Sequence, residues 1–113
     1  MIPKDQNRDK KIEEVIKKCA TKFLLEEGSN ASLLTVTNVI VSPKFEQATI
    51  FFTAFPENKE KTALEFLKRK RPEFKEILKN ETRLQRIPFV DFEIDIGEKN
   101  RQNIERLSNE AGM

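Results

Sequence analysis

The spacing of apolar residues changes several times along this 113-residue chain, and it limits the possible folds more than any other feature. From Asp9 to Glu27 apolar residues recur every three or four positions, which is typical of one face of an amphipathic helix. From Leu33 to Ser42 and from Gln47 to Phe55 they follow the two-residue period of strands. Pro43 to Glu46 makes a short turn between these strands, so we expect an antiparallel hairpin.

Regular alternation also predicts which side chains of each strand share a face. In the first strand it places Leu34, Val36 and Ile40 on one face and Val39 and Val41 on the other. In the second strand the residues expected to share a face are Ala48, Ile50, Phe52 and Ala54.

A second helical pattern runs from Ala63 to Arg71 and resumes at Phe74, with a proline between the two parts. Proline within a helix lacks a backbone N–H and collides with the carbonyl four residues earlier. We therefore expect Pro72 to kink or split this helix and to open its second piece.

The last pattern is a strand followed by a short helix. A two-residue period runs from Ile87 to Ile96, and after Gly97 a short amphipathic helix is expected through Ile104 and Leu107. The order helix, strand, strand, split helix, strand, short helix predicts an α+β fold. The length suits a single domain over residues 1–113, with an ordered core at about 8–107 and polar tails at both ends.

The composition argues against an enzyme. Histidine, tyrosine and tryptophan are absent, so the commonest general base and the commonest metal ligand are missing, and no cofactor or small-molecule substrate is implied. The lone Cys19 lies on the apolar face of the first helix and is expected to act as a small buried hydrophobe. Asp91, Glu93 and Asp95 could in principle hold a magnesium ion, but the solvated face of a half-buried strand is the preferred interpretation.

The expected localisation follows from the length of the apolar segments. No apolar run approaches the roughly 20 residues of a membrane span, and the first residues lack the apolar core of a secretory signal. We therefore expect a cytoplasmic protein without a membrane partner. Nothing in the pattern indicates an obligate dimer, so a monomer is expected.

Charge is unevenly distributed along the chain. Residues 59–86 carry ten cations and five acids, whereas residues 87–113 carry three cations and six acids. Such asymmetry attracts polyanions even when the net charge is only +2. The candidate RNA-binding residues are Lys68, Arg69, Lys70, Arg71, Lys75, Lys79, Arg83 and Arg86. A solvated helix exterior is the alternative explanation, and it is preferred for the lysines of the first helix, including Lys11, because acids interleave with them.

Four segments together resemble one protein family. They are RDKKIEEVIKKCATKFLLEE, LLTVTNVIVSPKFEQATIFFTAF, the basic TRLQRIP at residues 82–88, and FVDFEID at residues 89–95. In this order they resemble the ribosome-binding factor A family over about residues 8–107. The resemblance implies a type II KH-like domain, a three-stranded sheet packed by two to three helices, without the Gly-x-x-Gly loop of other KH domains.

The chain also departs from the family pattern. Lys70, Arg71 and Pro72 stand where the family usually has an alanine-x-glycine break, Lys75 stands where it often has an arginine, and Lys44 replaces a common acid in the hairpin turn. Proline breaks a helix by a different mechanism from glycine.

The resemblance implies a non-enzymatic assembly factor that binds the small ribosomal subunit and its rRNA during late maturation and supports rRNA end processing. On this hypothesis the kinked helix aims its cations at RNA phosphates. The alternative is a KH-like protein-interaction module without RNA binding, which would use the exposed face of the hairpin or the acidic third strand.

Overall fold

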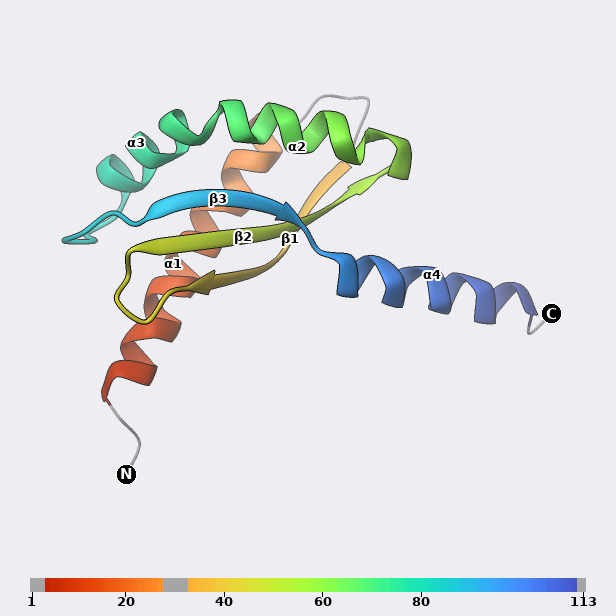
Figure 1. The fold of residues 1–113 in the computed structure, drawn as a ribbon, viewed down its shortest axis with the longest axis horizontal. Coiled ribbons are helices and arrows are strands. Elements are labelled where there is room, and N and C mark those ends of the chain that lie inside the picture. The colour runs from red at the N-terminus through yellow and green to blue at the C-terminus, as the bar shows by residue number, and fades with distance from the viewer. Residues whose placement is uncertain (1–3, 28–32, 112–113) are drawn as a thin grey trace.

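The computed structural model describes residues 4–27 and 33–111, and its elements follow the predicted order (Figure 1). The elements are α1 (Lys4–Glu27), β1 (Leu33–Val41), β2 (Gln47–Phe55), a 3-10 turn (Glu57–Lys59), α2 (Glu60–Arg69), α3 (Arg71–Glu81), β3 (Phe89–Ile94) and α4 (Ile96–Ala111). The three strands form one sheet in the order β1-β2-β3. The α+β class is therefore confirmed.

The sheet is mixed. β1 and β2 pair antiparallel, which confirms the predicted hairpin, whereas β2 and β3 pair parallel, with Gln47 opposite Phe89 and Phe52 opposite Ile94. A parallel pair needs a long crossover connection, and the segment containing α2 and α3 supplies it. This crossover places the helix pair along the β3 side of the sheet (Figure 1).

Three aromatic rings join the helices to the sheet. Phe23 of α1, Phe74 of α3 and Phe92 of β3 are each at most 1% exposed, and their ring centroids lie 5.1 to 6.4 Å apart. Because Phe92 contacts both of the other rings, α1 and α3 must cover the same face of the sheet. The expected inward residues of β2, from Ala48 to Ala54, are buried on this face.

β1 departs from regular alternation at Thr37. The pairing moves from Val36 opposite Phe52 to Asn38 opposite Phe51, which leaves Thr37 as the extra residue of a β-bulge. Leu34, Val36, Val39 and Val41 are consequently all buried, while Ile40 is 52% exposed. The predicted grouping of Ile40 with Leu34 and Val36 was wrong, because the bulge exchanges the two faces halfway along the strand.

The C-terminal part also differs in its boundaries. β3 begins at Phe89 rather than at Ile87, and Ile96 begins α4 instead of ending the strand. α4 is longer than expected and extends away from the sheet (Figure 1), with Ile104 64% exposed. The side chain of Leu107, which was expected on the apolar face of this helix, lies outside the described residues.

Cys19 packs against the core, although it is half-buried rather than fully enclosed. Burial raises the pKa of its thiol, and the nearby Glu81 carboxylate adds to this effect. A thiol held protonated in this way is a poor nucleophile. The structural role that the sequence predicted for Cys19 agrees with this environment.

Candidate nucleic-acid interface

A single non-helical residue divides the crossover helix. α2 ends at Arg69, Lys70 adopts φ −90° and ψ 3°, and α3 begins at Arg71 with Pro72 as its second residue. The Lys70 N–H donates to the carbonyls of Phe66 and Leu67, while the Lys70 carbonyl accepts from the N–H of Phe74 at 3.0 Å. Proline has no helical N–H to lose in a first turn, so Pro72 opens α3 as predicted. We call Lys70 and its two flanking helix ends the helix break.

Buried side chains fix the helix break on both sides. Leu67 of α2 and Phe74 of α3 are each 0% exposed, so both helices are anchored in the same core. The intervening residues cannot turn inward without displacing these anchors, and the charged side chains therefore remain at the surface. Local sequence and core packing thus produce the same geometry.

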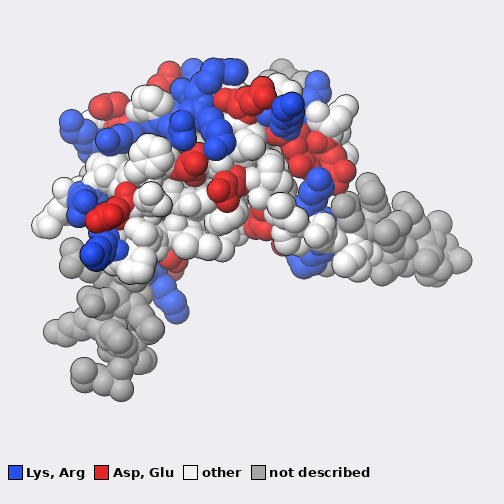
Figure 2. All heavy atoms as spheres, viewed as in Figure 1, with Lys and Arg blue, Asp and Glu red and all other residues white. Residues whose placement is uncertain are grey.

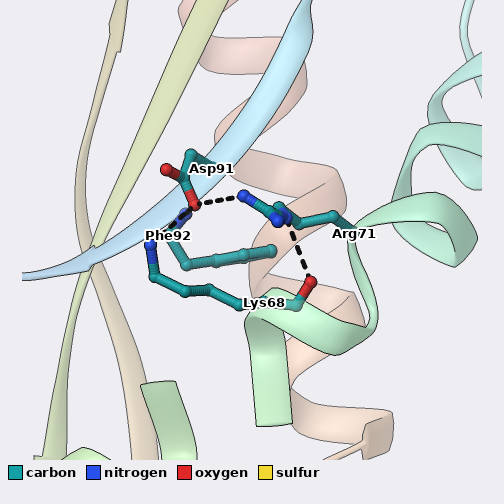
Figure 3. Close-up of polar contacts among 4 residues, drawn as sticks. All are labelled: Lys68, Arg71, Asp91 and Phe92. Atoms are coloured by element: carbon teal, nitrogen blue, oxygen red, sulfur yellow. Dashed lines mark hydrogen bonds and ion pairs between the residues drawn. The ribbon is translucent and has the colours of Figure 1, made fainter. Parts of the chain in front are cut away.

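One carboxylate oxygen binds cations from both sides of the helix break (Figure 3). Asp91 Oδ1 lies 3.3 Å from Lys68 Nζ and 3.2 Å from Arg71 Nη1, and the Arg71 Nε–H donates to the Lys68 carbonyl at 3.0 Å. The Arg71 guanidinium also lies 5.6 Å from the centroid of the Phe89 ring. These contacts hold Arg71 in one orientation and neutralise part of the charge beside β3.

Among the other predicted cations at the helix break and along α3, only Lys70 forms ion pairs within the part of the chain that the structure describes. Lys70 Nζ lies 3.3 Å from Glu73 Oε1 and 4.0 Å from Glu27 Oε2. Arg69, Lys75 and Lys79 are exposed and make no ion pair within the described ranges 4–27 and 33–111. These three side chains can therefore meet an external anion without first giving up an internal partner.

Arg83 and Arg86 belong to a different place on the surface. They lie in the segment between α3 and β3 and line a groove together with Lys11 of α1 and Lys44 of the hairpin turn. No residue of the helix break lines this groove. The eight predicted residues are therefore divided between two places on the surface. The groove that contains Arg83 and Arg86 also contains Lys11 and Lys44, which were not among the candidate site residues. Of these, Lys44 carried a signal in the sequence, because it replaces an acid that the family often has.

Cationic side chains gather in two regions of the surface, with acidic side chains among them (Figure 2). Blue side chains gather along the upper side, over α2 and α3, and a smaller group lies at the lower left, at the end of the sheet where the hairpin turn lies. Acidic side chains also lie in the middle of this view and toward its right side. A cationic region of this size raises the local concentration of polyanions.

The three acids of the last strand segment have separate roles. Asp91 binds Lys68 and Arg71, Glu93 is exposed, and Asp95 accepts hydrogen bonds from Thr37 and from the N–H of Glu98. Among the described residues no group of three or more metal-ligating side chains is placed to hold an ion. Nor does any helix in that part of the chain have the length and apolar character to cross a membrane.

The element order, the mixed three-stranded sheet and the helix pair that lacks a glycine loop define a type II KH-like fold. Comparison with protein families gives the same class and narrows it, since the model of the family described as ribosome-binding factor A matches residues 8–108. The chain belongs to the ribosome-binding factor A family.

Individual relatives agree with this assignment. The ribosome-binding factor A of Flavobacterium johnsoniae is 33% identical over an aligned length of 105, and the match covers 84% of this chain and 81% of that protein. The crystal structure of ribosome-binding factor A from Thermus thermophilus is similar with a TM-score of 0.66 and 26% identity, covering 76% of this chain and 94% of that one. A homology model of the Thermus thermophilus ribosome-binding factor A, fitted into a cryo-EM map of a 30S complex with that factor, has a TM-score of 0.62 and 25% identity and covers 70% of this chain and 86% of that one.

Proposed function

We propose that this protein is a cytoplasmic assembly factor that binds the small ribosomal subunit, contacts its rRNA during late maturation and supports processing of the rRNA ends. Membership of the ribosome-binding factor A family supports the general role. The Thermus thermophilus relative placed in a 30S complex supports the choice of partner. The proposed activity is binding rather than catalysis.

The observation that carries the proposal is the set of cations at the helix break and along α3. Arg69, Lys75 and Lys79 are exposed and have no ion-pair partner among the described residues, and Arg71 is held in place by Asp91 and Phe89. Cations fixed on a rigid element release counterions from a phosphate backbone without prior rearrangement. The residues proposed to contact phosphates are Lys68, Arg69, Lys70, Arg71, Lys75 and Lys79 at the break, with Arg83 and Arg86 beyond it.

The chain must make these contacts through side chains. Other KH domains clamp the nucleic-acid backbone with a Gly-x-x-Gly loop, but no glycine occurs here between Gly28 and Gly97. Here α2 and α3 are separated by Lys70 alone, so there is no loop between them. Long cationic side chains tolerate varied phosphate positions, so this surface is suited to folded RNA more than to one fixed sequence.

A protein-interaction role remains the second candidate, and one observation favours it. Leu33 and Phe55 are paired across β1 and β2 and are 62% and 69% exposed, and Phe89 is 57% exposed. Exposed apolar side chains on strands are a common feature of protein contact surfaces. If this role dominated, substitution of Leu33 and Phe55 would abolish subunit binding and substitution of the cations would not.

A salt series with purified small ribosomal subunits tests the RNA-binding proposal. The variant R69A/K75A/K79A removes three exposed cations at the break, and K17A/K18A/K22A removes three from α1 as the matched control. We expect the break variant to bind more weakly and the slope of log affinity against log salt to shrink by roughly 2 to 3. Equal binding and equal slopes for the two variants would contradict a phosphate-binding role for the helix break.

A further inference from the structure

A groove at one end of the molecule is built from three segments that are distant in the sequence. Its walls come from α1, from the turn between β1 and β2, and from residues 83–88, and its volume is about 510 Å³. Volumes of about 300 to 1,000 Å³ are typical of sites for small ligands. We call this site the end groove.

Four cations surround the end groove. Lys11, Lys44, Arg83 and Arg86 are all exposed. Among the residues whose side chains the structure describes, no acid lines the groove and none makes an ion pair with any of the four cations. In a chain where 35% of residues are charged and nearly balanced in sign, this is a local excess of positive charge. The groove therefore selects for anions.

The floor of the end groove is apolar. Ile12, Leu84 and the fully buried Pro88 contribute to it, and so does Phe45, whose side chain is half-buried. A simple phosphate would leave this floor uncovered. A ligand that fills the groove needs both anionic groups and a flat apolar body.

The turn that carries Phe45 is held in a restricted conformation. Phe45 has φ 59°, in the left-handed region that residues other than glycine rarely adopt. Its N–H donates to the Ser42 carbonyl at 2.9 Å, and the Ser42 hydroxyl oxygen accepts from the N–H groups of Glu46 and Gln47 at 3.0 Å. Non-glycine residues persist in this region when the surroundings hold them there, which often occurs at functional sites.

The wall formed by residues 83–88 is tied to the same turn by a backbone hydrogen bond. The N–H of Phe89, directly after the 83–88 segment, donates to the Glu46 carbonyl at 2.9 Å. On the other side, the Thr82 hydroxyl donates to the Leu78 carbonyl and accepts from the Leu84 N–H at 3.4 Å. Lys44 in the turn and Arg83 and Arg86 in the 83–88 segment are therefore carried by backbone that hydrogen bonds hold in place.

We propose that the end groove binds an unpaired nucleotide of single-stranded RNA, with the base against Phe45 and the flanking phosphates on Lys11, Lys44, Arg83 and Arg86. This inference rests on the proposed function and deepens it, because it assigns a second RNA contact of a different kind from the phosphate contacts at the helix break. Single strands are bound by cationic grooves in which bases stack on aromatic side chains. A paired base cannot enter, since its faces are covered by its neighbours in the duplex.

Binding of a short, labelled, unstructured RNA oligonucleotide tests the proposal, with a hairpin RNA of the same length as competitor. Phe45→Leu keeps an apolar side chain and removes the ring, and R83A/R86A removes two cations. Phe55→Leu, which alters an exposed ring at the end of β2 opposite the turn that carries Phe45, is the matched control. Thermal unfolding of each variant identifies any loss caused by misfolding.

We expect Phe45→Leu to lower oligonucleotide affinity about tenfold with little change of salt slope, because it removes stacking and no charge. R83A/R86A should lower both affinity and slope, while Phe55→Leu should do neither and the hairpin should compete poorly. Unchanged affinity in folded Phe45→Leu would overturn the proposal, as would equal competition by the hairpin or by an acidic peptide. If the natural chain binds ribosomal subunits but not the oligonucleotide, the end groove is not a nucleotide site and the proposed function stands. Failure to bind either would remove both.

Discussion

At the scale of single residues, Asp95 connects the bulge of β1 to the start of α4. One of its carboxylate oxygens accepts a hydrogen bond from the Thr37 hydroxyl, and the other accepts from the N–H of Glu98 at 2.9 Å. Thr37 is the bulged residue, so the irregularity of β1 brings its hydroxyl to this carboxylate. Asp95 thereby caps α4, which makes few other contacts with the sheet.

These hydrogen bonds predict how stability depends on pH. The bond from Thr37, followed by the one from the Glu98 N–H, lowers the pKa of Asp95 below its ordinary value. A carboxyl with a depressed pKa in the folded state stabilises the protein above its unfolded pKa of about 3.9, and this contribution is lost as pH falls through the folded value. We expect Asp95→Ala to cost about 1 kcal/mol at neutral pH and to reduce the loss of stability on acidification.

Urea unfolding at about pH 7 and about pH 3 measures both effects, because these values lie on either side of a carboxyl titration. Thr37→Val, which removes one of the two hydrogen bonds and keeps the carboxylate, should give a smaller change in the same direction. Unchanged stability of the Asp95 variant at neutral pH would show that Asp95 does not stabilise the start of α4.

At the scale of elements, the three-ring contact of Phe23, Phe74 and Phe92 joins α1, α3 and β3. Phe74 lies just after the helix break and is fully buried, so it also sets the direction of α3. Replacing a buried phenylalanine by alanine costs about 3 to 5 kcal/mol. Since domains of this size have about 5 to 15 kcal/mol in total, we expect Phe74→Ala to be close to unfolding at physiological temperature.

Chemical unfolding of Phe74→Ala beside Phe55→Ala checks this expectation. Phe55 is 69% exposed, so its truncation should change the free energy of unfolding by less than about 0.5 kcal/mol. Comparable losses in the two variants would mean that the three rings are not the centre of the core.

Which elements the sequence could predict depends on how local their causes are. The helix break was predictable because Pro72 acts within its own turn, and β2 was predictable because its period is uninterrupted. The bulge was not, since Val39 and Ile40 are both apolar and β-branched and alternation alone could not decide which of them is buried. The start of α4 had a readable signal, an aspartate at Asp95 followed three positions later by Glu98.

The candidate site divides in the same way. The cations from Lys68 to Arg71 are adjacent in the chain, so their grouping was visible in the sequence. The end groove was not, because Lys11, Lys44 and Arg83 come together only through packing of α1 and pairing of the hairpin. The pairing of Asp91 with Lys68 and Arg71 likewise depends on β3 lying beside the crossover helices.

At the scale of the whole molecule, the two cationic surfaces raise the question of whether one RNA engages both. The helix break and the end groove share no residue, so substitutions in one should leave the geometry of the other intact. For distant, independent sites the changes in binding free energy add. Two contacts to a single partner also strengthen each other, because the first raises the effective concentration of the second.

We therefore expect the combined variant R69A/K75A/K79A/R83A/R86A to lose, in binding free energy for small ribosomal subunits, about the sum of the losses of its two parent variants. Titration of subunits at one fixed salt concentration, with K17A/K18A/K22A as the charge control, provides the four affinities of this cycle. If the two surfaces served separate ligands, only one of them would face the subunit, and the combined variant would bind no more weakly than the weaker parent. A loss in each parent variant, with the two losses adding in the combined variant, would thus place both surfaces against the same rRNA, with the helix break holding phosphates and the end groove holding an unpaired nucleotide.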